Sequence, residues 1–148
     1  DRLRVAATIG DDELLALDVD VLAPSAIEGQ ITGHNADQVK AKLIVEGANG
    51  PTTTEADDIL DDRGIFVVPD ILANAGGVIV SYFEWVQDAQ RFFWKATDIQ
   101  DRLRDLMTSA FQRTLQFATA KGTSMRMAAL MTGIDKVAQA HLSRGLYP

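Results

Sequence analysis

The sequence predicts an α/β protein in which parallel strands alternate with short helices and are followed by long C-terminal helices. Three strands are expected, and four if residues 1–10 add an edge strand. Two observations support this prediction. In residues 1–70 short apolar runs end at proline or glycine and alternate with helical segments, as buried strands of a parallel sheet do. In residues 71–148 apolar side chains recur every three or four positions, which is the spacing of one helix face.

The first half contains three candidate strands, each a short run of apolar residues. They are expected at residues 19–22, 42–45 and 65–68. Each run is followed by a residue that interrupts a strand: proline lacks the N–H that a ladder needs, and glycine favours a turn. These residues are Pro24, Gly47 and Pro69. The helical segments of this half are expected at residues 11–17, 34–39 and 52–63.

The helix at residues 52–63 has signals at both of its ends. Thr52 and Glu55 fit a capping box, and acidic residues in the first turn suit the positive end of the helix dipole. Gly64 follows where a left-handed C-terminal cap is expected.

Two long helices with one buried face each are expected in the second half. The first helix is expected to begin at a cap of Thr97 or Asp98 and to end at Gly122. The final helix is expected to begin at a cap of Thr123 or Ser124 and to end at Gly145. The core-facing residues expected in the final helix are Ala128, Met131, Ile134, Ala138 and Leu142. Core packing, rather than ligand binding, is the simpler interpretation of their apolar side chains.

Composition excludes several classes of function. The chain has 148 residues, no cysteine, two histidines and a net charge of −7. No disulfide, thiolate zinc site or cysteine nucleophile is therefore possible, and no metal site is expected. Scattered basic residues argue against nucleic acid, and polar residues that interrupt the apolar stretch at residues 66–83 argue against a membrane span. The chain begins without methionine and in mid-pattern, so we expect a piece of a longer protein.

Two loops follow predicted strands at the edge where open α/β sheets bind ligands. In residues 46–51 small side chains permit close approach of a ligand to the backbone, although a plain strand-to-helix turn has the same composition. In residues 69–81 adjacent glycines precede a helix, and Asn74 and Ser81 offer polar groups. The glycines indicate either a ligand or a closely packed helix.

The other polar candidates are weaker. Glu84, Asp88 and Arg91 lie on one expected helix, where a solvated face or a subunit contact is favoured over acid–base chemistry. His34 and His141 have no neighbouring serine, cysteine or histidine and are expected at the surface.

Three motifs together resemble the cofactor-binding domain of the glutamate dehydrogenase family, which also contains leucine, phenylalanine and valine dehydrogenases. They are DVLAPSA at residues 20–26, VEGANGPTT at residues 45–53 and PDILANAGGV at residues 69–78. The segment VSYFEWVQ at residues 80–87 resembles the glutamate-specific branch. The resemblance implies one incomplete, Rossmann-like, doubly wound dinucleotide-binding domain over residues 1–148, with an alternating part at 1–70 and a mainly helical part at 71–148.

The resemblance also implies roles for individual residues. Asn49 resembles the residue beside the nicotinamide ribose, and Asn74 resembles the asparagine that holds the nicotinamide carboxamide. Ser81 resembles the hydroxyl that binds the side-chain carboxylate of the substrate, and Val78 lines that pocket. The turn beneath the dinucleotide is matched by Pro24, Ser25 and Ala26.

The implied activity is oxidative deamination of L-glutamate to 2-oxoglutarate and ammonia with NAD or NADP. The family's phosphate-binding turn, catalytic lysine and catalytic aspartate have no match here, so we expect no catalytic residue in this chain and no activity from it alone. The resemblance implies a homohexamer in the cytoplasm, or in the mitochondrial matrix of a eukaryote. The alternative is a non-catalytic truncated cofactor-binding or assembly module.

Overall fold

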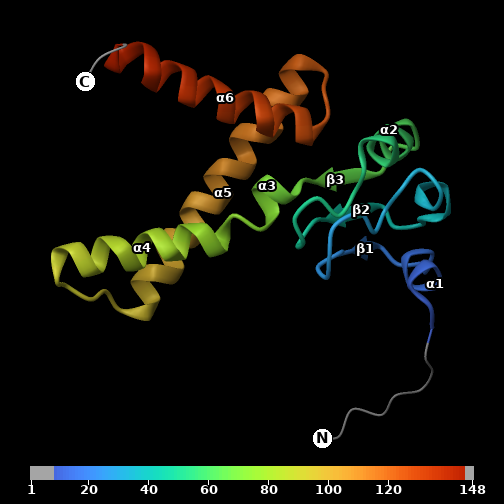
Figure 1. Cartoon of the computed structure of the whole chain (residues 1–148), viewed down its shortest axis with the longest axis horizontal. Helices are drawn as coiled ribbons and strands as arrows, with labels where there is room; N and C mark the ends of the chain where they lie inside the picture. The colour runs from blue at the N-terminus through green and yellow to red at the C-terminus, as the bar shows by residue number, and fades with distance from the viewer. Residues whose placement is uncertain (1–8, 146–148) are drawn as a thin grey trace, which may run out of the picture. The chain divides into compact units, whose positions relative to one another are not determined.

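The computed structural model describes residues 9–145, and the chain divides into two compact units, residues 1–66 and 67–148. The first unit contains α1 (Asp11–Leu15), β1 (Val21–Leu22), the 3-10 helix η1 (Ala36–Gln38), β2 (Leu43–Val45), α2 (Thr54–Asp62) and the start of β3 (Phe66–Val68). The second unit contains α3 (Asp70–Ala73), α4 (Gly76–Gln90), α5 (Ala96–Lys121) and α6 (Met125–Arg144). Figure 1 shows this order along the chain.

The strands form one sheet in the order β1-β2-β3, as the α/β prediction requires. β1 and β2 are parallel, with Val21 opposite Leu43 and Leu22 opposite Ile44. β3 joins through the N–H of Phe66, which donates to the carbonyl of Lys42 over 3.1 Å. The possible edge strand at residues 1–10 lies almost wholly outside the described residues.

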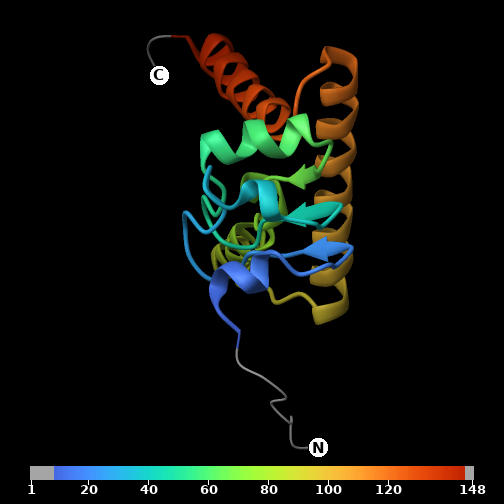
Figure 2. The same ribbon diagram turned by 90° about the vertical axis from the view of Figure 1, so that its right-hand side faces the viewer.

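Helices α1, η1 and α2 lie on the same side of the three strands (Figures 1 and 2). Apolar side chains of this unit are buried, among them Ile31, Val39, Ile44 and Leu60. The guanidinium of Arg63, at the end of α2, donates to the carbonyls of Ala36 and Val39 over 2.6 and 2.7 Å. This fork satisfies carbonyls at η1 and fixes η1 against α2.

The cap of α2 differs from the expected capping box. Thr53, not Thr52, precedes the helix and accepts a hydrogen bond from the N–H of Ala56 over 3.3 Å. Thr52 is instead held in an isolated parallel bridge with Ile31, so its backbone is extended and its side chain is buried. The expected stop is confirmed, because Gly64 has a left-handed φ of 70°.

The second unit is built around the 26-residue helix α5, against which α3, α4 and α6 pack. Its core is a cluster of Leu72, Ala118, Met125 and Ala128. Val68, Ala110, Phe111 and Phe117 surround this cluster.

The expected caps of α5 at Thr97 or Asp98 are wrong, because Lys95 precedes the helix and makes no side-chain cap. The turn into α5 is held by α4 instead: the N–H of Trp94 donates to Oε1 of the buried Gln87 over 2.7 Å. Gly122 ends α5 with a left-handed φ of 62°, as expected. Ser124, one of the two expected caps, accepts from the N–H of Met127 and begins α6.

The expected buried face of α6 is present only at the start of the helix. Ala128 is fully buried, but Met131, Ile134 and Leu142 are 45%, 67% and 80% exposed. Ala138 is exposed as well. Helical spacing identifies an apolar face, but no element of the described chain covers this one beyond its first turns.

Candidate functional site

The two loops that follow β1 and β2 are held together by backbone hydrogen bonds. The carbonyl of Pro24 accepts from the N–H groups of Gly47 and Ala48 over 3.0 and 2.9 Å. Pro24 and Ala48 are buried. The structure therefore brings the Pro24 turn next to the loop that carries Asn49, as expected for two strand ends at one edge of a sheet.

A side chain at Gly47 would crowd Ser25 at this contact. A Cβ atom placed on Gly47 would overlap Oγ of Ser25 and lie 3.1 Å from its Cβ. Ser25 is itself fixed by a hydrogen bond from its hydroxyl to the carbonyl of Ala23 over 3.1 Å. Ser25, Ala26 and Asn49 are exposed, so their side chains are accessible to a ligand.

Two polar residues at the ends of this loop are buried: Glu46 was not singled out from the sequence, and Thr52 was expected only as a helix cap. Glu46, the first residue after β2, is fully buried. The hydroxyl of Thr52 is buried and has no hydrogen-bond partner among the described residues. A buried hydroxyl without a partner is uncommon and calls for an explanation. Neither sequence periodicity nor a known spacing signals the burial of these two residues.

The residues predicted in the second loop lie on the α3–α4 segment, directly after β3. Asn74 ends α3, and its carbonyl accepts from the N–H of Gly77 over 3.4 Å. Val78 and Ser81 follow on α4 at spacings of four and three residues. Val78 and Ser81, three residues apart, therefore lie on one side of α4, and Asn74 precedes that helix in the turn that joins α3 to α4. Asn74 is half-buried, whereas Ser81 is exposed and Val78 is 76% exposed.

The two adjacent glycines at the start of α4 are not explained by close packing of a helix. A Cβ atom on Gly77 would meet no described atom within 4 Å. On Gly76 it would make an ordinary contact of 3.8 Å with Leu103 of α5. Since glycine is less favourable than alanine inside a helix, an approach to the backbone from outside the described chain is the better interpretation.

The structure also shows where the weaker polar candidates lie. Glu84 and Asp88 of α4 border a cavity of about 520 Å³ in the second unit, together with Phe93 and Ile99. His34 and His141 are exposed, as expected. Within residues 9–145 no group of three or more His, Cys, Asp or Glu side chains is arranged to hold a metal ion.

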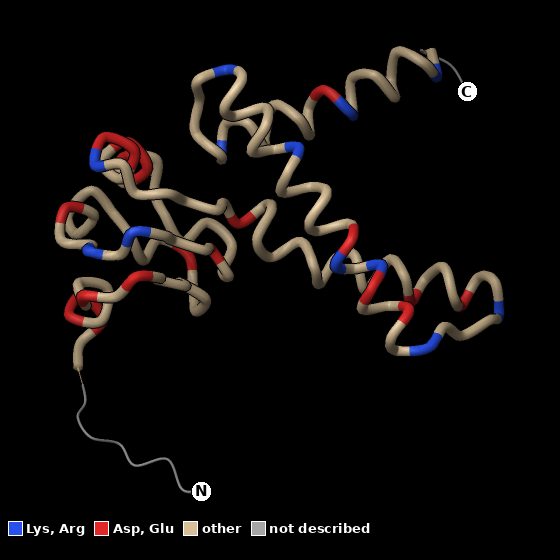
Figure 3. Tube along the Cα trace, turned by 180° about the vertical axis from the view of Figure 1, so that it is seen from behind, with Lys and Arg blue, Asp and Glu red and all other residues tan. Residues whose placement is uncertain are grey.

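Lysine and arginine residues are dispersed over several elements of the described chain, with acidic residues between them (Figure 3). None of the helices in the described part of the chain combines the length and the apolar character needed to cross a membrane.

Comparison with known proteins identifies the relatives of this chain. A family model for glutamate/leucine/phenylalanine/valine dehydrogenases matches residues 3–145. Glutamate dehydrogenase of Thermotoga maritima is 56% identical over 140 residues, which are 95% of this chain and 34% of that protein. The cryptic catabolic NAD-specific glutamate dehydrogenase GudB of Bacillus subtilis is 50% identical over 138 residues, which are 93% of this chain and 32% of that protein.

Solved structures agree with these relatives. The hetero-hexameric glutamate dehydrogenase of Thermus thermophilus, in a leucine-bound form, superposes with a TM-score of 0.90 at 35% identity. The match covers 95% of this chain and 34% of that one. Glutamate dehydrogenase of Peptoniphilus asaccharolyticus gives a TM-score of 0.80 at 40% identity over 84% of this chain and 32% of that one. The chain thus spans about a third of the length of these relatives, and it belongs to the glutamate/leucine/phenylalanine/valine dehydrogenase family.

Proposed function

We propose that the chain is part of an oxidoreductase that converts L-glutamate to 2-oxoglutarate and ammonia with a nicotinamide dinucleotide. The observation that carries this proposal is the succession of Asn74, Val78 and Ser81, in the turn between α3 and α4 and in the first turns of α4, immediately after β3. It combines an amide, an apolar side chain and a hydroxyl, which are the groups needed to orient a carboxamide and to select a side-chain carboxylate.

In this proposal Ser81 selects the substrate. Its exposed hydroxyl donates a hydrogen bond to the side-chain carboxylate of glutamate, and Val78 contacts the methylene groups. A site built to bind a polar group discriminates strongly against substrates that lack it, because the polar group of the protein then loses its partner. Apolar fit alone discriminates by far less.

Asn74 holds the nicotinamide carboxamide. Its side-chain amide has both a donor and an acceptor, and a primary carboxamide matches both. The open space beside Gly77 permits the ring to approach the backbone at the start of α4. When bound, the nicotinamide supplies the acceptor for the substrate hydride. The residues of this chain fix the relative position of ring and substrate, which is a large part of catalysis.

Pro24, Ser25 and Ala26 form the turn beneath the dinucleotide, and Asn49 lies beside the nicotinamide ribose. The hydrogen bonds from Gly47 and Ala48 to Pro24 support this assignment, because they hold the two loops in a fixed relation. NAD is the first cofactor to test, because the relative from B. subtilis at 50% identity is named as NAD-specific. A hexamer is the first assembly to test, because the relative from T. thermophilus is described as hetero-hexameric.

We assign no general acid or base to the described residues, and we expect the 148-residue chain alone to be inactive. The alternative function, a non-catalytic assembly module, is favoured by a different observation. Ile134 and Val137 of α6 are 67% and 72% exposed, and apolar surface of this kind promotes association.

The test is a kinetic comparison of the full-length protein with the 148-residue chain. Reduction of NAD and of NADP is followed with L-glutamate, L-leucine, L-phenylalanine and L-valine as substrates. The proposal predicts turnover by the full-length protein with the highest kcat/KM for L-glutamate, and none by the chain alone. Preference for one of the three apolar amino acids would contradict the substrate assignment, and absence of turnover with all four would support the assembly module.

A further inference from the structure

The position of Asn74 depends on the short helix α3, which has only four residues. The backbone carbonyl of Asp70, its first residue, accepts from the N–H of Asn74 over 3.0 Å. The side-chain Oδ1 of Asp70 accepts from the N–H of Ile71 over 2.7 Å. A helix this short is not stable by itself, so contacts with the rest of the protein determine where it lies.

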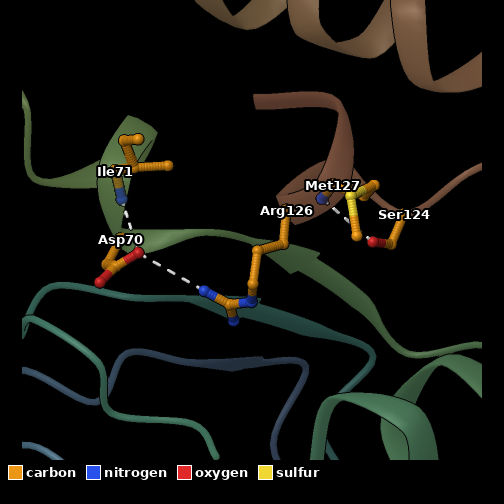
Figure 4. A network of polar contacts seen from close by, with 5 residues as sticks. All are labelled: Asp70, Ile71, Ser124, Arg126 and Met127. Carbon is orange, nitrogen blue, oxygen red and sulfur yellow. Dashed lines mark hydrogen bonds and ion pairs between the residues drawn. The ribbon is translucent and has the colours of Figure 1, made fainter. Parts of the chain in front are cut away.

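One of these contacts is an ion pair with α6 (Figure 4). Nη1 of Arg126 lies 3.4 Å from Oδ1 of Asp70, and the two side chains are only 22% and 24% exposed. For comparison, the pair of Arg104 and Asp101 in the same unit is 76% and 73% exposed. Exposed pairs contribute little, whereas loss of one partner from a sheltered pair leaves a charge with poor solvation.

The place of Arg126 in its own helix is unfavourable. Arg126 is the second residue of α6, where the helix dipole is positive and an acidic side chain is preferred. Helix α6 already has a side-chain cap from Ser124. A residue that opposes the local helix preference but pairs with a distant carboxylate points to a role in the tertiary structure. Arg126 forms its ion pair with a carboxylate 56 residues earlier in the chain, that of Asp70.

We propose that Arg126 is a positioning residue: through Asp70 it fixes α3, and α3 in turn places Asn74 against the nicotinamide. This inference rests on the proposed function. Leu72 buries the apolar side of α3 in the core, and the ion pair adds a directional contact at the start of the helix. Without that contact α3 keeps its burial but loses a fixed orientation. A displacement of about 1 Å at a reacting centre can lower a rate by about 100-fold.

The test uses the full-length enzyme with two substitutions, Arg126→Gln and Asp70→Asn. Asp70→Asn removes the negative charge but keeps an oxygen that accepts from the N–H of Ile71, so it is the milder change. Arg104→Gln is the matched control, since it removes an arginine from an exposed pair in the same unit. The measurements are kcat per folded enzyme, KM for L-glutamate, the melting temperature, and the deuterium isotope effect on kcat with L-glutamate deuterated at C2.

The proposal predicts that both substitutions lower kcat by about 10- to 100-fold, with little change in the KM for L-glutamate and with a larger isotope effect. The double variant is expected to be no slower than the slower single variant, because the two residues act as one unit. Arg126→Lys is expected to recover part of the loss, and Arg104→Gln to leave kcat unchanged.

A lower melting temperature with unchanged kcat and isotope effect would overturn the proposal and assign the pair a purely structural role. If Arg126→Gln fails to fold, Asp70→Asn decides between these two results. A wild-type enzyme that does not oxidise L-glutamate would overturn the proposed function itself, and the inference with it. The activity of the wild-type enzyme therefore distinguishes failure of the inference from failure of the proposed function.

Discussion

The contact between Gly47 and Ser25 leads to a prediction about the two loops of the first unit. Gly47→Ala places a methyl group in overlap with Oγ of Ser25 and 3.1 Å from its Cβ. Rotation of the Ser25 side chain relieves the first overlap at the expense of its hydrogen bond to the carbonyl of Ala23. The second contact remains, since the Cβ atom of Ser25 does not move on rotation. Gly47 does not have a positive φ, so the cost of the substitution includes no backbone strain.

We expect Gly47→Ala to cost about 1–2 kcal/mol, the lower part of the range for overpacking. This corresponds to a roughly 5- to 30-fold increase in local opening. Hydrogen–deuterium exchange of the full-length protein measures it at the amides of Gly47 and Ala48, which donate to Pro24. Binding of NADH, titrated by fluorescence, is expected to weaken as well, because the same loop carries Asn49.

Two variants make the prediction specific. Adding Ser25→Gly removes both atoms of the overlap, so the double variant is expected to regain most of the protection relative to Ser25→Gly alone. Gly133→Ala, in the middle of α6 with open space around it, is expected to be neutral or stabilising by up to about 1 kcal/mol. Exchange in Gly47→Ala that equals the wild type, or a double variant that shows no recovery, would refute the clash.

Two further predictions concern helix ends and the exposed face. Thr53→Ala removes the cap of α2 and is expected to destabilise the protein by about 1 kcal/mol, whereas Thr52→Val removes a buried hydroxyl without a partner and is expected to be neutral or stabilising. Urea unfolding measures both changes in the free energy of unfolding. A larger loss of stability in Thr52→Val than in Thr53→Ala would indicate that Thr52, not Thr53, caps α2. Val137→Lys is expected to lower self-association of the 148-residue chain in light scattering, while Gln139→Lys on the same helix is not; equal effects would argue against an apolar contact.

Local signals in the sequence predicted much of the fold. Pro24 and Pro69 follow β1 and β3 because the missing N–H ends a ladder, and Gly64 and Gly122 end α2 and α5 because both positions need a left-handed φ. These effects depend on one or two residues. Asn74 and Ser81 were singled out as polar groups of the loop after β3, whereas Val78 and the roles of all three residues came from the family resemblance and stay predictions.

Contacts between distant segments were not predictable in the same way. Thr53 rather than Thr52 caps α2, because Ile31, 21 residues earlier, holds Thr52 in a parallel β-bridge. The start of α5 is set by Gln87 of α4, and α3 is tied to α6 by Arg126. The spacing of apolar residues showed that α6 has an apolar face. It did not show what covers that face, because the same spacing occurs in a helix packed on a core and in a helix packed at an interface.

The proposed selection of glutamate by Ser81 is tested most directly by the ratio of kcat/KM for L-glutamate to kcat/KM for L-leucine. Ser81→Val in the full-length enzyme removes a hydrogen bond to a charged group, which corresponds to about 1.5–3 kcal/mol or a roughly 10- to 150-fold lower kcat/KM for L-glutamate. Ser81→Thr keeps the hydroxyl and is the control. The account predicts that the ratio falls by at least about 10-fold in Ser81→Val and stays near the wild-type value in Ser81→Thr. An unchanged ratio in Ser81→Val would contradict the central claim.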